Sequence, residues 1–509
     1  MKFSPTFTCL TLALLICGGP GCGSGSGMQV SLPPGTPPPS GGAGLNRVKH
    51  IIVVMMENHS FDNYLGALAY APASPYHAAA LGCAADDHSC VDGLLCSRDP
   101  AGTLACSDSN PTDTGSTVLA FHAPSRCVVP DLDHSWPGSH REANFSAPNT
   151  ALTDPLNDGF IRVNALTEPA SGSATLSFYT QDDLPFYYDL AQKFAIDDRY
   201  FAAVMGPTLP NRFYLMAATS FGHVDTGDSA PADAFKPLHG TILDLLDSAG
   251  VAWTDYSQDG PQAAAFRAPS TASDPHFQPV QTFLTTASGS GTLPEVSFVD
   301  PGFFGPGEND EHPPTDIQRG QAFVAQLVNA VRNGPYWQDS VIFITWDEHG
   351  GFYDHVAPPA ASQGSARTPD GISPGQCADL SNPPASQQPG GGIGCSASVS
   401  RAQALCPELA QNPNGPYPVN CASFDQLGFR VPFLVVSPFA RAHYVSHAIG
   451  DHTSILAFIE ARFLARAHLT RRDQNADTLM DLFDFDNAPS LSTSVTTAQL
   501  PTVDCTPGQ

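Results

Sequence analysis

The chain has 509 residues and carries 49 acidic against 22 basic side chains, which gives a formal net charge of −27. This length fits one large α/β domain or a few smaller ones, with a sizeable buried core in either case. The acidic field repels a nucleic-acid backbone and an anionic membrane. We therefore expect no nucleic-acid partner, and an anionic substrate requires a local positive site or a metal ion.

Residues 1–22 resemble a secretory signal peptide, with one lysine, a short apolar run and then small residues. The run is too short to span a bilayer. Cys22 precedes GSGSG, as in a bacterial lipoprotein site where the cysteine is acylated, although Gly19 stands where such sites usually carry leucine. Cleavage without lipidation is the alternative. We expect an exported protein that is secreted, periplasmic or lipid-anchored, and that meets a membrane only through such an anchor or a lipid substrate.

Residues 23–46 are rich in Gly and Pro and lack apolar periodicity, which predicts a flexible tether. Three of the 13 cysteines belong to the leader, and the ten that follow are an even number in an exported chain, so we expect disulfide bonds. Most of the ten lie in two polar segments, residues 77–130 and 360–426. These segments predict loop insertions stapled by disulfides, whose pairing the sequence does not give.

From residue 47 onward, short apolar runs typical of buried strands alternate with stretches typical of amphipathic helices. The strand-like runs are VKHIIVVMME, VAWTDY, EVSFVD, SVIFITWDE and RVPFLVVSPF. Such alternation predicts an α/β sandwich around a largely parallel sheet. The sequence has neither an internal repeat nor a second domain onset, so we expect residues 47–509 to form one domain that carries the two insertions.

Three of the apolar runs end abruptly in acidic or amide residues. They are followed by Glu57-Asn58, by Asp300 and by Asp347-Glu348-His349. Open α/β sheets bind ligands outside the carboxyl ends of their strands. Several polar strand ends therefore predict one shared site at that edge of the sheet.

The segment GPTLPNR, residues 206–212, places Thr208 just ahead of an amphipathic helix. Pro210 is acceptable in a first helical turn, where free backbone N–H groups and the helix dipole favour an anion. The alternative is that Thr208 only caps the helix, which is a common role for threonine.

Four loop histidines accompany the acidic residues: His134, His312, His349 and His355. A single exposed loop histidine is usually only solvated. Carboxylates clustered beside histidines, however, supply what a hard cation and a proton donor require.

Six sequence blocks, in order, resemble those of the bacterial phosphoesterase family that contains non-haemolytic phospholipases C and related acid phosphatases. The blocks are ENHSFDNYLG, DHSW, GPTLPNR, DEHPP, WDEHGGFYDHVAPP, and RVPFLVVSP followed by DHTSILAFIE. The resemblance implies an alkaline phosphatase-like fold, which is a three-layer sandwich with a mixed, mostly parallel sheet between helices.

The resemblance also implies roles for individual residues. The roles are nucleophile for Thr208, catalytic phosphoryl contacts for His134 and His312, substrate contacts for Asn58, His355 and Asn211, and metal ligands for Glu57, Asn58, Asp347 and Glu348. The chain departs from the family pattern at His59, Leu65 and His349, and these departures mainly put a family role for His349 in doubt.

Phosphoryl transfer passes through a loose transition state, so it needs an in-line nucleophile, positive charge on the non-bridging oxygens and an acid for the leaving alcohol. Oxygen-rich ligands favour a hard divalent ion such as calcium, magnesium or manganese. We therefore expect a phospho-threonine at Thr208, with His134 or His312 protonating the leaving oxygen.

The leading hypothesis is a phospholipase C-like phosphoric ester hydrolase. Threonine rather than serine at position 208 favours this activity. The expected substrate is a phosphate ester, with phospholipid as one case. An acid phosphatase on the same core is the alternative. A non-catalytic surface lipoprotein that only binds is the alternative from another class.

Overall fold

The computed structural model describes residues 44–79, 82–100, 102–127, 131–144, 156–167, 172–228, 230–271, 274–361, 369–372, 377–381, 424–498 and 500–501. The predicted signal peptide lies outside these residues, as do nearly all of the predicted tether and most of the segment 360–426. Among the residues described, no helix combines the length and the apolar character needed to cross a bilayer.

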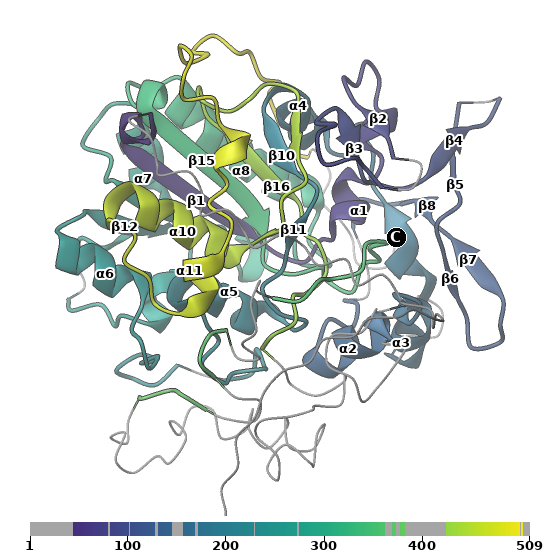
Figure 1. Ribbon diagram of the computed structural model, residues 1–509, viewed down its shortest axis with the longest axis horizontal. Helices are drawn as coiled ribbons and strands as arrows, with labels where there is room; N and C mark the ends of the chain where they lie inside the picture. Colours follow the sequence, from purple (N-terminus) through teal and green to yellow (C-terminus); the bar gives the residue numbers. More distant parts are fainter. Residues whose placement is uncertain are drawn as a thin grey trace, which may run out of the picture. The chain divides into compact units, whose positions relative to one another are not determined.

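An eight-stranded sheet forms the centre of the fold (Figure 1). Its strands, in spatial order, are β13 (Phe277–Pro279), β12 (Trp253–Ser257), β14 (Val296–Asp300), β1 (His50–Met56), β15 (Ser340–Trp346), β16 (Phe433–Val436), β10 (Ala195–Asp197) and β17 (Tyr444–Ser446). Strand β16 runs antiparallel to both of its neighbours, and the other pairs are parallel. The predicted mixed, mostly parallel sheet is therefore confirmed.

The central strands form because their apolar residues are covered on both faces of the sheet. Every residue of β15 is buried, and so is β1 from its second residue onward. Continuous apolar runs of this kind are typical of parallel strands between two helical layers. In the register, Met56 lies opposite Trp346, and Val53 lies opposite Phe298. The carboxyl ends of β14, β1 and β15 are thus neighbours, as the polar strand ends predicted.

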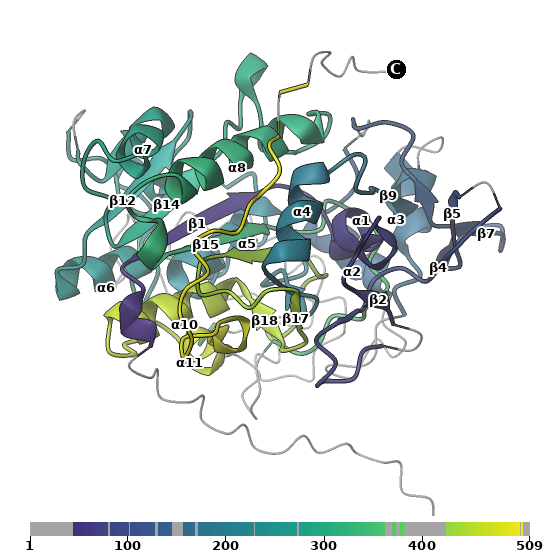
Figure 2. The same cartoon turned by 90° about the horizontal axis from the view of Figure 1, so that it is seen from above.

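Helices cover both faces of the sheet, which confirms the predicted three-layer sandwich (Figure 2). One layer contains α4 (Pro185–Lys193), α7 (Val280–Ala287) and α8 (Ile317–Arg332). The other contains α5 (Thr208–Ala217), α6 (Ile242–Ala249), α10 (His452–Phe463) and α11 (Arg471–Asn475). Within each layer the helices pack against one another, α8 against α4 and α7, and α10 against α5, α6 and α11. Shorter helices α1 (Phe61–Leu65), α2 (Trp136–Ala143) and α3 (Phe160–Thr167) lie in the connections.

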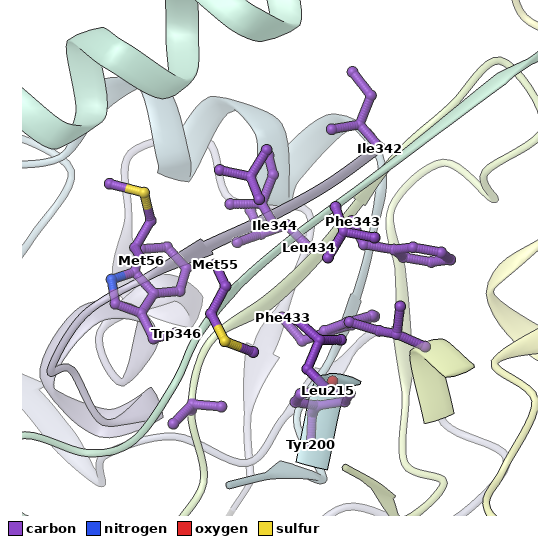
Figure 3. Close-up of a cluster of buried hydrophobic side chains, with 14 of the residues drawn as sticks. Met55, Met56, Tyr200, Leu215, Ile342, Phe343, Ile344, Trp346, Phe433 and Leu434 are labelled. Atoms are coloured by element: carbon purple, nitrogen blue, oxygen red, sulfur yellow. The ribbon is translucent and has the colours of Figure 1, made fainter. Parts of the chain in front are cut away.

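Part of the main hydrophobic core lies where β1, β15 and β16 meet α5 (Figure 3). Met55 and Met56 from β1, Trp346 from β15, Phe433 from β16 and Leu215 from α5 are all buried there. Burying one such side chain contributes roughly 1.5–3 kcal/mol. Strands β1 and β15, which carry two of the polar strand ends, are therefore held by buried apolar contacts.

The segment 77–130 forms small two-stranded pairings outside the central sheet. Its strands are β2 (His77–Ala78), β3 (Cys90–Val91), β4 (Cys96–Arg98), β5 (Leu104–Cys106), β6 (Ser109–Pro111), β7 (Thr117–Leu119) and β8 (Phe121–His122). Two disulfides, Cys83–Cys90 and Cys96–Cys106, lie within it, and β8 pairs with β9 (Ser177–Phe178). The predicted stapling of this insertion is confirmed. In the second segment Cys377 is disulfide-bonded. Of the ten cysteines after the leader, the four outside the described residues are Cys395, Cys406, Cys421 and Cys505.

We expect mild reduction to expose residues 83–106 to proteolysis while the sheet stays folded. The two bonds close loops of 7 and 10 residues inside the insertion, and each is worth roughly 2–3 kcal/mol to that segment. Limited proteolysis with mass spectrometry, together with circular dichroism, checks this. The double variant Cys96→Ser/Cys106→Ser should give the same cleavage without reductant. Cooperative unfolding of the whole chain on reduction would contradict the expectation.

Candidate active site

Segments far apart in the sequence meet at the carboxyl edge of the sheet. The backbone N–H of Glu57 donates to the carbonyl of Asp310 at 2.9 Å. Gly350, with φ +64°, approaches the turn after β1 so closely that a Cβ atom would lie 2.2 Å from the carbonyl oxygen of Asn58. These contacts join the DEHPP and DEHGG blocks to the end of β1, so that three of the predicted motifs form one site.

The GPTLPNR block reaches the same site through Arg212 in helix α5. Its Nη2 lies 2.9 Å from Oε1 of Glu57, and its Nε lies 3.0 Å from Oδ2 of Asp347. Nη2 also donates to the backbone carbonyls of Met55 and Met56 at the end of β1. The guanidinium is 3% exposed, so the two carboxylates and the arginine form a buried ion triad.

The positive charge of Arg212 occupies part of the place where the sequence predicted a metal ion. Burial lowers the pKa of Arg212, but the charges of Glu57 and Asp347 outweigh it and raise the pKa, so the guanidinium stays charged. Burial and repulsion from Asp347 raise the pKa of Glu57, against the opposing effect of Arg212. Glu57, at the end of the strand, is therefore paired with a cation that belongs to the protein itself.

Asn58 and Glu348 are buried beside this triad with polar atoms left over. Asn58 has φ +66°, and its N–H donates to Oδ1 of Asp347 at 3.2 Å. Among the described residues, its Oδ1 and Nδ2 have no hydrogen-bond partner, nor does Oε1 of Glu348. An unpaired buried polar group costs roughly 1–3 kcal/mol, and such groups collect at functional sites. The left-over atoms indicate that this edge binds a polar ligand.

Two of the predicted catalytic histidines lie together beside Glu348. The rings of His134 and His312 have centroids 6.0 Å apart, and Nε2 of His134 is 3.9 Å from Oε1 of Glu348. Asp131 completes the group, with one ligand atom from each of these three lying within 4.8 Å of the others. Burial lowers the pKa of His134, but Glu348 and Asp131 outweigh it and raise the pKa. His134 is thereby suited to carry a proton near neutral pH.

Thr208 is the first residue of α5, and the capping position is taken by Pro207 without a side-chain capping bond. The alternative in which Thr208 caps the helix is therefore wrong. Its side chain is half-buried and lies one helical turn from Arg212. Residues four apart lie on the same helix face, so Thr208 and Arg212 share a side of α5.

Asn211 holds the turn that precedes Thr208. Its Oδ1 accepts from the N–H of Val204 at 3.0 Å, and its Nδ2 donates to the carbonyls of Gly206 and Pro207 at 2.8 and 3.1 Å. The structure thus places Asn211 against the turn that precedes Thr208, where its amide is engaged. Its predicted contact with substrate has no support from these bonds.

His355 lies in a separate polar cluster. Its Nδ1 is 2.7 Å from Oδ2 of Asp62, and its Nε2 is 3.2 Å from Oδ1 of Asp92 in the stapled insertion. Burial lowers its pKa, but the charge and hydrogen bond of Asp62 raise it to about 10. Arg430 pairs with Asp62 and Asp354 in the same cluster. The side-chain partners of His355 thus belong to this cluster, and its predicted contact with substrate stays a prediction.

Three residues near the predicted site were not predicted from the sequence: Arg212, Asp131 and Glu311. Arg212 could have been predicted, because it stands one helical turn after Thr208 and therefore on the same face of the helix. Glu311 is buried and accepts hydrogen bonds from the hydroxyls of Tyr187 and Tyr64 at 2.7 and 2.9 Å. The indole N–H of Trp346 is a third donor, at 2.8 Å. These bonds anchor the turn that carries His312.

We expect Glu311 to make folding stability depend on pH. Burial raises the pKa of Glu311 from 4.5 to about 8, so its contribution is complete below pH 4.5 and is lost as pH rises toward 8. Glu311→Gln cannot ionise and should reduce this loss by roughly 1 kcal/mol or more. Urea unfolding at about pH 5 and pH 8 measures it, with Glu308→Gln as the matched control. The same pH dependence in both variants would refute the assignment.

Comparisons with known proteins identify the family of the chain. The model of the Phosphoesterase family matches residues 48–465. Non-specific phospholipase C3 of Arabidopsis thaliana is 27% identical over 477 residues, which cover 91% of this chain and 78% of that protein. Phospholipase C B of Mycobacterium tuberculosis is 30% identical over 484 residues, which cover 88% of this chain and 80% of that protein.

Two solved structures show a weaker likeness. Human ectonucleotide pyrophosphatase/phosphodiesterase 5 is 13% identical with a TM-score of 0.31, over 59% of this chain and 94% of that chain. A protein in the alkaline phosphatase superfamily from Vibrio parahaemolyticus is 10% identical with a TM-score of 0.30, over 58% and 64% of the two chains. The family model spans most of the chain, and the sequence relatives span nearly all of it. This protein therefore belongs to the Phosphoesterase family and is a phosphoric ester hydrolase.

Proposed function

We propose that this protein is a phospholipase C-like hydrolase that works through a covalent phospho-threonine at Thr208. The observation that carries the proposal is the shared edge at which the start of α5, the ion triad of Arg212 and two histidines meet. The names of the sequence relatives support phospholipid as the substrate class. Acid phosphatase activity on monoesters is the alternative that the assay below separates.

In the proposed reaction, Oγ1 of Thr208 forms a bond to phosphorus as the bond to the leaving alcohol breaks. The start of α5 and Arg212 stabilise charge on the non-bridging oxygens. Nη1 of Arg212 is buried without a hydrogen-bond partner among the described residues, which supports this role. Water then cleaves the phospho-threonine and releases the phosphorylated product.

The leaving oxygen needs a proton, and His134 is placed to supply it. Its raised pKa favours the protonated ring, and Asp131 and Glu348 lie on either side of it. After the alcohol has left, the neutral ring can take a proton from the attacking water. His312, whose ring faces His134, is the second candidate for this role.

We also propose that a divalent cation binds at this edge. Oxygens of Asn58 and Glu348 that have no hydrogen-bond partner in the described part of the chain fit a hard, oxygen-seeking ion. Glu57 and Asp347 would share their carboxylates between that ion and Arg212. This donor set suits calcium, magnesium or manganese. When bound, such an ion supplies further positive charge for the phosphoryl oxygens.

We expect Thr208→Ala to fold and to lose nearly all turnover, since water does not replace a covalent nucleophile at the same position. Thr208→Ser should keep part of the rate. Purified protein is assayed on p-nitrophenylphosphorylcholine and on p-nitrophenyl phosphate, and preference for the diester supports a phospholipase. A tenth or more of the wild-type rate in Thr208→Ala would refute the covalent mechanism. No turnover of either ester by the wild type would favour a binding protein.

We expect Asn58→Ala and Glu348→Gln each to weaken metal binding by roughly tenfold or more, because each removes a proposed ligand oxygen. Elemental analysis after dialysis against a defined concentration of manganese or calcium measures the metal content independently of activity. Glu308→Gln is the control for a carboxylate outside the site. Lost activity with unchanged metal content would assign these residues to direct contact with the phosphate.

A further inference from the structure

A loop with an exposed aromatic tip follows strand β14, next to the site. We call residues 303–307, with the sequence FFGPG, the aromatic tip. Phe304 is 73% exposed, more than any other large apolar side chain among the described residues. Gly305, Pro306 and Gly307 are also exposed, so the apolar character of the tip is continuous. A single exposed phenylalanine needs no explanation, but a run of this kind beside a catalytic site does.

Hydrogen bonds within the chain hold the backbone of the tip. The carboxylate of Asp259 accepts the backbone N–H groups of Phe303 and Phe304 at 3.0 and 3.1 Å. Nε2 of Gln258 donates to the carbonyl of Gly307 at 2.7 Å, and Oδ1 of Asn309 accepts from Gly302 at 2.7 Å. The backbone is therefore fixed by internal hydrogen bonds, which lowers the cost of moving the tip into an apolar phase.

Phe303 ties the tip to the ion triad. The guanidinium of Arg212 lies 5.0 Å from the centre of the Phe303 ring, a cation–π distance. The rings of Phe303 and Phe304 are 6.2 Å apart at 57°, so one covers the arginine while the other is exposed. A surface that Phe304 contacts is therefore held next to Arg212 and its ion pairs with Glu57 and Asp347.

The charges around the tip favour one kind of surface. Asp259 and Glu308 flank it, and Nη1 of Arg319 donates to the carbonyl of Pro306 at 3.1 Å. Two carboxylates thus stand against one guanidinium, and the whole chain has a net charge of −27, so an anionic surface is repelled. A quaternary ammonium group, by contrast, is attracted both by carboxylates and by an aromatic face. Among apolar surfaces, a zwitterionic one with choline head groups fits this combination.

We infer that the aromatic tip docks onto a zwitterionic phospholipid surface and holds the site against it, with Phe304 inserted among the lipids. The inference rests on the proposed phospholipase function and adds the means by which substrate in a bilayer or micelle is met. Phe304 contacts the lipid surface and takes no part in bond cleavage. A second copy of the chain or an apolar pocket on another protein are the competing occupants.

The test compares Phe304→Ser with Leu119→Ser, which removes a 55% exposed apolar side chain from β7 in the insertion. Binding to phosphatidylcholine vesicles is measured by flotation, and hydrolysis of the same vesicles and of soluble p-nitrophenylphosphorylcholine is measured in parallel. We expect Phe304→Ser to lower vesicle binding and vesicle hydrolysis by roughly tenfold, from the lost burial of one phenyl ring. The soluble ester should be turned over at the wild-type rate, and Leu119→Ser should match the wild type throughout.

Vesicle binding within twofold of wild type in Phe304→Ser would overturn the inference, as would tighter binding to phosphatidylglycerol than to phosphatidylcholine. A change of oligomeric state in Phe304→Ser, seen by light scattering, would assign the tip to contact between copies and would also overturn it. If the wild type hydrolyses neither substrate, the proposed function fails while the flotation assay still decides on the tip. Wild-type protein that binds vesicles without hydrolysing them would therefore contradict the proposed function and leave the docking inference standing.

Discussion

The site depends on one buried interaction, the guanidinium of Arg212 between the carboxylates of Glu57 and Asp347. It fixes helix α5 to the ends of β1 and β15, and thereby fixes Thr208 one turn earlier in the same helix. Removing one partner from such a buried group typically costs about 3–5 kcal/mol, because the other charges remain unpaired in the interior. The same interaction therefore serves folding and, in the proposed mechanism, the stabilisation of phosphoryl charge.

The packing of turns makes this arrangement possible. Gly350 lets the turn after β15 contact the backbone of Asn58 directly, and the N–H of Glu57 binds the loop that carries Asp310 and His312. Residues that are separated by hundreds of positions thus reach one edge through backbone contacts, before any side chain is considered. Acidic side chains outnumber the arginine at this edge, and oxygens of Asn58 and Glu348 have no hydrogen-bond partner within the described ranges. Both observations support the proposed cation.

Sequence reasoning predicted the sheet and the convergence of its polar strand ends, because buried parallel strands have long apolar runs and share one carboxyl edge. It did not predict the ion triad, since a pairing between Arg212 and Asp347 spans 135 positions and depends on how α5 crosses the sheet. The partners of His355 also depend on the tertiary fold. It stands in the same sequence block as Asp347, and its ring pairs with Asp62 and Asp92.

The hydrogen bonds of Asn211 affect which parts of this sequence can change. Its three hydrogen bonds shape the turn before Thr208 from within the same short stretch of chain, Val204 to Asn211. Sequence changes outside this stretch leave those bonds in place, so the chain can vary elsewhere while Thr208 keeps its position.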